Sequence, residues 1–209
     1  NHTTLEGLLN IIGNLSYRTT KEDYTDYNAF SQAVKLNPTI PVMDPKDPGK
    51  YTFLKGYDTW NPVDRLKNRD NFGKNDYSTI DFTARLNVLS NLNMELKVAR
   101  QGRFLKRYEW YPSTHQESIS NSRKGRARLE SERWEDYTLE WITNYYTTIQ
   151  DVHNIKLMGG YSYQEFNWEK YGAENMDFPS DALKYNNLGT GQWNTKEGRL
   201  GMWSEKEKE

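Results

Sequence analysis

The sequence has 209 residues, of which 35% are hydrophobic, with a formal net charge of −1 and no cysteine. This charge gives no argument for nucleic-acid binding, and three widely spaced histidines without cysteine argue against a zinc site. A soluble domain with so few aliphatic residues usually relies on disulfides or metal, so the chain must bury its apolar surface in another way.

Aromatic residues reach 14% of the chain and include 15 Tyr and 7 Trp, a composition that fits an all-β protein with wet surfaces. No run of about 18 apolar residues is present, which excludes a transmembrane helix. A transmembrane β-strand, in contrast, needs only about 9–11 alternating residues. The chain opens without Met or a basic-then-apolar leader, which favours a segment of something longer.

The first extended segment covers residues 5–18, and a tract rich in Asn, Asp, Pro and Gly at 19–76 reads as loop. Its "DPKDPG" run at 44–49 has closely spaced Asp residues but lacks the spacing of a calcium loop, so a turn is favoured. The second segment, 77–88, alternates cleanly, and a short turn at 89–93 leads into a third at 94–99.

A basic and aromatic loop is expected at 101–132, followed by a strand at 134–149 with Trp141 on its apolar side. A turn at 150–154 leads into the strand "IKLMGGYSYQEF" at 155–166. Its apolar row is expected to face lipid, while Gly159 and Gly160 predict a bend or a close approach. A loop at 167–195 and a sixth strand near 197–203 follow.

The connections alternate long, short, long, short, long. In an up-and-down meander this order places every long loop at one end of the sheet, as in outer-membrane barrels. The alternation also fits a strand with one face on a soluble core, so a soluble β-rich carbohydrate-binding module remains the alternative. The regular alternation of long and short connections, here called loop parity, and the scarcity of aliphatic residues favour one fold. It is an all-β, antiparallel up-and-down meander that forms part of a large transmembrane β-barrel with long extracellular loops.

Ordered motifs carry a family resemblance. They are Gly160–Tyr161–Ser162–Tyr163–Gln164, Phe178–Pro179–Ser180–Asp181 and Tyr185–Asn186–Asn187–Leu188, preceded by "NPTIPVMDPKDPGKY" at 37–51, "NPVDRLKN" at 61–68 and a hairpin at 78–98. In this order they resemble the barrel region of SusC/RagA-type TonB-linked outer-membrane proteins. The resemblance covers nearly the whole of residues 1–209.

The resemblance implies an outer-membrane location in a Bacteroidota-type cell and active import of oligosaccharides or peptides through a barrel of about 22 strands. It also implies a SusD-like surface lipoprotein as a lid, energy from TonB, contact with outer-membrane lipid and no cofactor. Six strands at most are expected here, without a plug domain or TonB box, so the chain reads as part of such a barrel. The resemblance also makes the family's plug domain a candidate for the close approach expected at Gly159 and Gly160.

Candidate functional residues lie in the expected loops. His115 and Glu117 lack a nucleophile at a recognisable spacing, and no enzyme activity is expected. The cluster Arg123, Lys124, Arg126 and Arg128 could form a polyanion site or meet lipopolysaccharide phosphates. Glu130, Glu132 and Glu135 follow immediately, however, so a solvated loop face is favoured.

Loop aromatics are the better candidates for ligand binding, because flat rings stack on sugars or on apolar parts of peptides: Tyr57, Trp60, Trp110 and Tyr111. Their alternative role is to pack the loops on one another or on the lid. Trp168 and Tyr171 are expected in an interfacial aromatic girdle.

Overall fold

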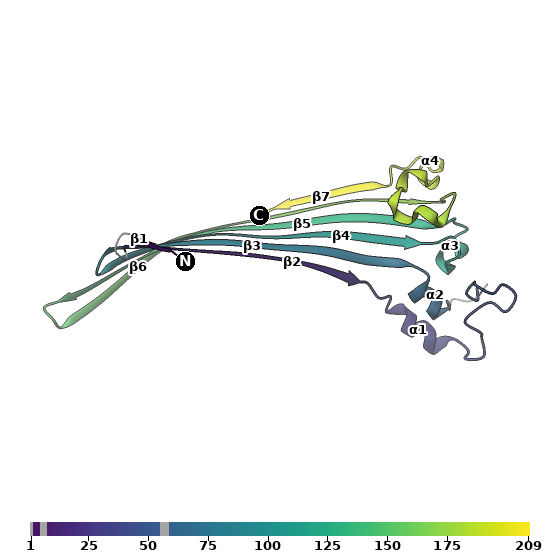
Figure 1. The fold of residues 1–209 in the computed structure, drawn as a ribbon, viewed down its shortest axis with the longest axis horizontal. Helices are drawn as coiled ribbons and strands as arrows, with labels where there is room; N and C mark the ends of the chain where they lie inside the picture. Colours follow the sequence, from purple (N-terminus) through teal and green to yellow (C-terminus); the bar gives the residue numbers. More distant parts are fainter. Residues whose placement is uncertain (1, 5–7, 55–58) are drawn as a thin grey trace.

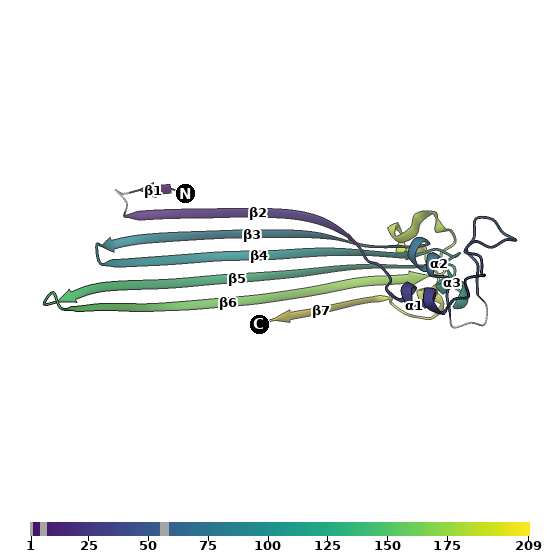
Figure 2. The same cartoon turned by 90° about the horizontal axis from the view of Figure 1, so that it is seen from below.

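A computed structural model describes residues 2–4, 8–54 and 59–209 and contains one antiparallel sheet in the strand order β1-β2-β3-β4-β5-β6-β7 (Figures 1 and 2). The strands are β1 (His2–Thr4), β2 (Leu9–Asp23), β3 (Asp70–Leu89), β4 (Leu92–Tyr111), β5 (Arg126–Ile149), β6 (His153–Met176) and β7 (Met202–Lys208). Each strand pairs with its sequence neighbour, which confirms the predicted up-and-down meander.

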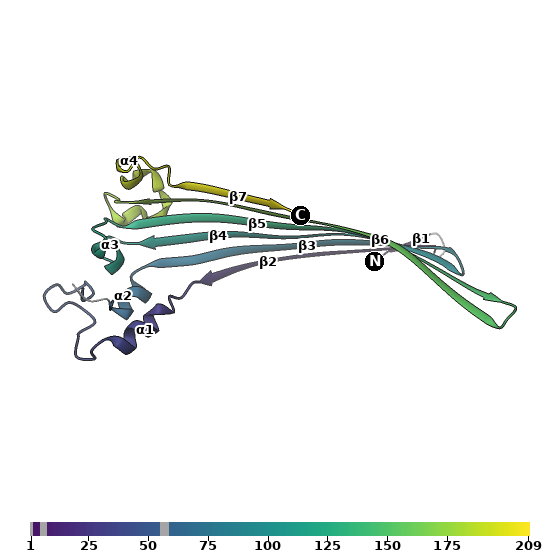
Figure 3. The ribbon, with the colours of Figure 1, turned by 180° about the vertical axis from the view of Figure 1, so that it is seen from behind.

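The long connections all lie at one end of the sheet, here called the loop end, and the short ones at the opposite turn end (Figure 3). The long connections contain α1 (Asn28–Lys35), α2 (Pro62–Lys67), α3 (Gln116–Ser120), the 3-10 helices η2 (Asp181–Asn186) and η3 (Leu188–Thr190), and α4 (Trp193–Lys196). None of the helices in the described residues is long and apolar enough to cross a membrane. The predicted loop parity is therefore confirmed.

The strands extend much further towards the loop end than the sequence predicted. Residues 19–23 and 70–76 continue β2 and β3, and residues 101–111 continue β4, although all were assigned to loops. The predicted sixth strand near 197–203 lies at Met202–Lys208 instead. These segments carry Lys, Arg, Asp and Glu on both faces, so they lack the alternation that identifies a half-buried strand.

The continuous register collects apolar side chains on one face of the sheet, called the apolar belt. For example, Leu96 pairs with Trp141, which pairs with Tyr161. The belt consists of Leu9, Ile11, Leu15, Tyr17, Ile80, Phe82, Ala84, Leu86, Met94, Leu96, Val98, Leu139, Trp141, Tyr145, Ile155, Leu157, Tyr161 and Tyr163. Many of these side chains remain exposed, including 77% of Leu15 and 59% of Leu157. The opposite side is called the polar face, and at midsheet it carries Lys97, Glu140 and Ser162.

The small buried core lies at the loop end rather than along the sheet. Trp110 and Ala127 face each other across β4 and β5, and Phe178 packs edge-on against Trp110 with ring centroids 5.2 Å apart. Most other buried residues there are polar, among them Asn61, Asp64 and His115. Polar contacts between the loops, rather than a large apolar core, therefore hold the loop end together.

The two central glycines of β6 differ in what surrounds them. A Cβ on Gly160 would lie 2.9 Å from the backbone carbonyl oxygen of Trp141, whereas a Cβ on Gly159 would meet nothing within 4 Å. The close approach therefore occurs within the sheet, to β5, whereas the sequence suggested an approach to a separate plug domain.

We expect Gly160→Ala to lower the thermal unfolding midpoint of the intact protein, because a backbone atom of β5 cannot move aside without breaking the ladder. Gly159→Ala is the matched control, and it is expected to be neutral or to stabilise by about 0.5–1 kcal/mol, because glycine weakens strand interiors. Equal midpoints for the two variants would contradict this assignment.

Candidate functional site

A row of aromatic and cationic side chains crosses the polar face on the loop-end side of the belt. In register, it consists of Arg18, Tyr77, Arg103, Trp134 and Trp168. Their alternation follows from the sequence, because each strand contributes one residue of the row at its pairing position. We call this set the cation–aromatic row.

The guanidinium groups of the row lie on aromatic rings. Arg18 lies 4.5 Å from the centroid of Tyr77, while Arg103 lies 5.6 Å from Tyr77 and 4.7 Å from Trp134. The Nε of Arg103 donates to Asn75 Oδ1 at 2.9 Å. Within the part of the chain that the structure describes, neither arginine forms an ion pair with a carboxylate. The row thus presents positive charge and ring surface together, a combination that suits ligands with carboxylate or planar groups.

Nearer the loop end, the charges on the polar face are paired with one another. Glu130 is buried and accepts from Arg128 at 2.6 Å, with Lys170 at 3.5 Å and Arg107 at 3.8 Å. Lys170 also lies 3.1 Å from Glu132. This network is locally compensated, which distinguishes it from the unpaired arginines of the row.

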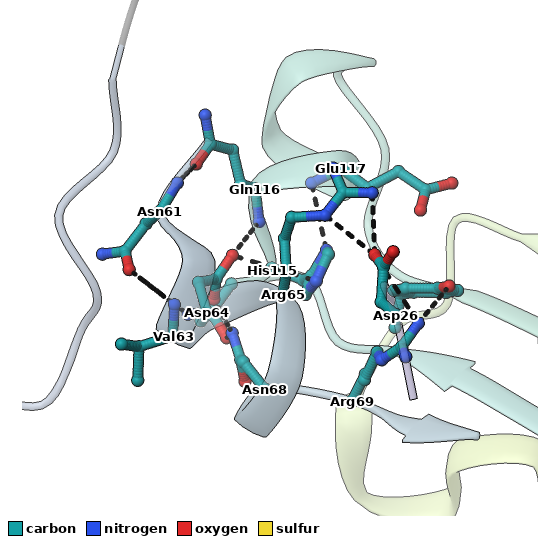
Figure 4. Close-up of polar contacts among 12 residues, drawn as sticks. Asp26, Asn61, Val63, Asp64, Arg65, Asn68, Arg69, His115, Gln116 and Glu117 are labelled. Atoms are coloured by element: carbon teal, nitrogen blue, oxygen red, sulfur yellow. Dashed lines mark hydrogen bonds and ion pairs between the residues drawn. The ribbon is translucent and has the colours of Figure 1, made fainter. Parts of the chain in front are cut away.

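Two of the long connections are joined by a buried polar cluster, shown in Figure 4 and called the loop latch: Asn61, Asp64, Asn68, His115 and Gln116. The backbone N–H of Asn61 donates to Gln116 Oε1 at 2.9 Å, and the N–H of Gln116 donates to Asp64 Oδ2 at 2.8 Å. Asn61 also caps α2 by accepting from the N–H groups of Val63 and Asp64. These reciprocal bonds fix the first long connection on the second.

Charged side chains support the latch from the side of α1 and α2. Arg65 lies 2.7 Å from Asp26, and its guanidinium lies 4.6 Å from the ring centroid of Trp60 (Figure 4 shows the ion pair). The Nη1 of Arg69 donates to the hydroxyl of Tyr111 at 3.2 Å. Burial, together with the nearby carboxylate of Glu109, raises the pKa of Tyr111 to about 12, so its hydroxyl stays protonated.

His115 is the most deeply buried ionisable base of the latch, with 2% of its surface exposed. Its Nδ1 accepts from the N–H of Glu117 at 3.1 Å and caps α3, so the ring proton resides on Nε2, 3.9 Å from Asp64 Oδ2. Burial, and then Arg69 and Arg65, lower the pKa of His115 to about 4. The imidazole is therefore neutral at pH 7, and its role in this position is structural.

The structure places the predicted ligand-binding aromatics in different settings. Tyr57 lies outside the described residues. Trp60 is half-buried beside Arg65 in a long connection, as predicted. Trp110 and Tyr111 were assigned to a loop, but they end β4 and are 2% and 8% exposed. Placing those two in a loop was wrong, and their rings pack the loop-end core in this structure.

The predicted basic cluster is largely neutralised by carboxylates. Arg126 lies 2.8 Å from both Glu117 and Glu174, Arg123 lies 3.4 Å from Asp177, and Arg128 pairs with Glu130. These contacts tie strand and loop ends together, so little charge is left for a polyanion.

The structure tests two further predictions by the position of the residues. Trp168 lies on the polar face and Tyr171 on the opposite one, so Trp168 does not belong to a girdle on the belt side. The "DPKDPG" run forms a turn closed by the bond from Lys50 N–H to Asp47 O at 3.1 Å, as favoured. No cluster of three or more potential metal ligands occurs among residues 2–4, 8–54 and 59–209.

The cation–aromatic row and the loop latch were not predicted as sites. The row was detectable in principle from the pairing register, but the segments that carry it had been read as loops. The latch joins residues more than 50 positions apart, for which the sequence gives no signal.

No family model matches the sequence, and no curated protein does. Solved structures match its fold. The chain aligns to a chain of the RagAB peptide transporter with a TM-score of 0.73, 15% identity, and coverage of 96% of this chain and 23% of that chain. The "closed-closed" and "open-open" states of the RagAB peptide importer match with TM-scores of 0.73 and 0.72, at the same identity and with coverage of 23% and 22% of those chains. The predicted likeness to SusC/RagA-type proteins is thereby confirmed for the fold, and the chain spans about a quarter of the transporter chains it matches.

The loop latch is expected to loosen as the pH falls from 6.5 towards about 5. Opening lets His115 return to its ordinary pKa of 6.5, so the open form binds a proton that the closed form, with a pKa of about 4, excludes. Stability is therefore complete above pH 6.5 and falls by up to about 1.4 kcal/mol per pH unit below it. Burial raises the pKa of Asp64, and this shift acts in the opposite sense. The loss caused by His115 ends as the pH nears its closed-state pKa of about 4.

Hydrogen exchange of the Asn61 and Gln116 amides, corrected for intrinsic rates, measures this opening. His115→Asn is the matched control, because Asn still caps α3 but does not titrate. An equally steep pH dependence in both proteins would rule out His115 as the cause.

Proposed function

We propose that this chain forms part of the barrel wall and extracellular mouth of a TonB-dependent outer-membrane transporter. The observation that carries the proposal is the apolar belt, which stays exposed across five adjacent strands in register. A water-soluble sheet would need a second layer over such a face. The fold likeness to the RagAB transporter supports the same assignment.

The belt has the height that a bilayer requires. On β2 it runs from Leu9 to Tyr17 and on β6 from Ile155 to Tyr163, nine residues in each case. A tilted transmembrane strand needs about 9–11 residues. The belt would face lipid, the loop end would lie outside the cell, and the polar face would line the barrel interior.

In this orientation, the cation–aromatic row lies inside the barrel below the three long connections. We propose that it contacts the imported molecule, an oligosaccharide or a peptide, or the plug domain. Trp60 in the first long connection, together with Tyr57, remains the proposed outer contact for that molecule. A SusD-like lipoprotein would cover the loop end, as the RagAB complex suggests by its composition, and TonB would act through parts outside this chain.

The alternative is a soluble β-rich carbohydrate-binding module. It predicts that the belt is covered by another layer or that the protein is monomeric in buffer without detergent. Fractionation of cells distinguishes the two functions, because the transporter requires detergent for extraction from the outer-membrane fraction. A detergent-free monomer that binds a glycan would overturn the transporter assignment.

Trp141→Lys is expected to reduce the amount of folded protein in the outer membrane, because a lysine facing lipid near the bilayer midplane costs about 2–4 kcal/mol. Ile142→Lys is the matched control, since Ile142 is the next residue on β5 and lies on the polar face opposite Gly160. Folded protein in the membrane fraction is measured by protease protection. Equal loss in both variants, or none in either, would contradict the assignment of faces.

Trp134→Ala is expected to raise the substrate concentration for half-maximal uptake by about twofold to thirtyfold, because a stacking or cation–π contact is worth about 0.5–2 kcal/mol. Leu139→Ala on the opposite face of β5 serves as the control and should leave uptake unchanged at equal surface expression. Uptake of labelled peptides and of labelled oligosaccharides is measured in parallel in intact cells. Unaltered uptake of both classes by Trp134→Ala would remove the row from the substrate path.

A further inference from the structure

Three lysines lie side by side on the face that carries the apolar belt, beyond the belt towards the loop end. Lys21 on β2 pairs in register with Lys74 on β3, which pairs with Lys106 on β4. All three are exposed. Like charges directly opposite each other on neighbouring strands destabilise a sheet, so this arrangement calls for a bound anion.

The protein supplies less negative charge around this lysine row than the three lysines carry. Lys21 lies 3.8 Å from Asp23, and both side chains are largely exposed. Lys74 and Lys106 form no ion pair within the described residues. Asp76, in the adjacent row of the same face, is a second nearby carboxylate and accepts hydrogen bonds from Thr19 and Tyr17. Three ammonium groups therefore stand beside two carboxylates, and a net positive charge remains.

Aromatic rings hold the ammonium groups at the surface without neutralising them. Lys21 Nζ lies 4.6 Å from the centroid of Phe72, and Lys74 Nζ lies 5.8 Å from that of Tyr108. Phe72 and Tyr108 are stacked with centroids 4.9 Å apart, and Tyr185 of the last long connection packs on both. That connection therefore borders the lysine row on its loop-end side.

Between the belt and the lysine row lies a depression of about 350 Å³, whose lining includes Tyr17, Ser78 and Gly102 together with charged groups of both signs. Asp76 and Glu135 line it, and Glu135 is ion-paired with Arg100 and Arg133. Gly102 keeps it open, because a Cβ there would lie 2.9 Å from Ser78 Oγ. Hydroxyl groups and paired charges next to a lipid-facing surface fit the sugar part of a lipid headgroup better than a soluble ligand.

The distance of the lysine row from the edge of the apolar belt also matches the position of lipid headgroups. Lys21 follows Tyr17, the last belt residue of β2, by four residues, or about 10 Å above the belt edge at the usual rise and tilt. The headgroup layer on each side of a bilayer is about 5–8 Å thick, and a lysine stem spans the remaining distance.

We propose that Lys21, Lys74 and Lys106 bind phosphate groups on the headgroups of outer-leaflet glycolipids. This inference rests on the proposed membrane position of the belt. The lysines supply the charge, the depression receives part of the sugar headgroup, and the last long connection limits how far the lipid extends outward. The site is distinct from the ion-paired cluster around Arg126.

The test uses the intact protein reconstituted in phosphatidylcholine nanodiscs that contain either a bisphosphorylated glucosamine-disaccharide lipid or its dephosphorylated form. Native mass spectrometry counts the glycolipids that stay bound. The variant is Lys21→Gln/Lys74→Gln/Lys106→Gln. The control, Lys35→Gln/Lys46→Gln/Lys67→Gln, removes the same charge from exposed lysines of the first long connection.

We expect the wild type and the control to retain the phosphorylated lipid, and the row variant to retain at least about tenfold less, with binding weakened by salt. Equal retention in all three proteins, or equal binding of both lipid forms by the wild type, would overturn the inference. Binding of inorganic phosphate with the same affinity as the lipid would also overturn it, in favour of a simple anion site. Loss of lid association without loss of lipid would assign the row to the lid.

Nanodisc incorporation is recorded separately. A wild-type protein that fails to incorporate would refute the proposed function itself, whereas an incorporated protein without lipid preference refutes only this inference.

Discussion

Continuous backbone pairing is the constraint on which the rest of the structure depends. Because side chains alternate with a period of two, an uninterrupted register from β2 to β6 sends every belt residue to one face and every member of the cation–aromatic row to the other. A slip of one residue in one strand would exchange its faces. At the edge of the sheet, β1 pairs with Leu9, Asn10 and Ile11 of β2. Among the described residues, the rest of that edge of β2 is therefore open to a further strand.

The loop end solves a different problem, since it must hold three long connections in place without a large apolar core. It does so with buried polar groups that satisfy one another, such as Asn61, Gln116 and Asp64. Polar networks of this kind specify one arrangement sharply, because any missing partner leaves a buried group unsatisfied. His115 is the exception in this network, because its Nε2 is buried without a hydrogen bond among the described residues. The lowered pKa of His115 keeps the imidazole neutral, so no unpaired charge is buried there.

The sequence predicted those parts of the fold in which one face is apolar. At Ile80, Phe82 and Leu86 the alternation is unambiguous, and the predicted faces agree with the pairing. It failed where both faces are polar, as at Lys74, Asp76 and Arg103, because hydrophobic periodicity vanishes there although the backbone ladder continues. Trp110 and Tyr111 were misplaced for this reason. The loop latch was beyond reach, since bonds between distant loops depend on which strands bring those loops together.

The two strand faces beyond the belt are chemically similar in composition but differ in how their charges are compensated. On the polar face, Glu130 contacts Arg128, Arg107 and Lys170, whereas Arg18 and Arg103 below this network form no ion pair within the described residues. On the belt side, three lysines stand in one register beside two carboxylates, Asp23 and Asp76. Uncompensated charge therefore occurs on each face at a defined height, just beyond the belt. In a barrel wall those two positions meet different surroundings, the interior and the headgroup layer, so a strand with polar residues on both faces still specifies two separate surfaces.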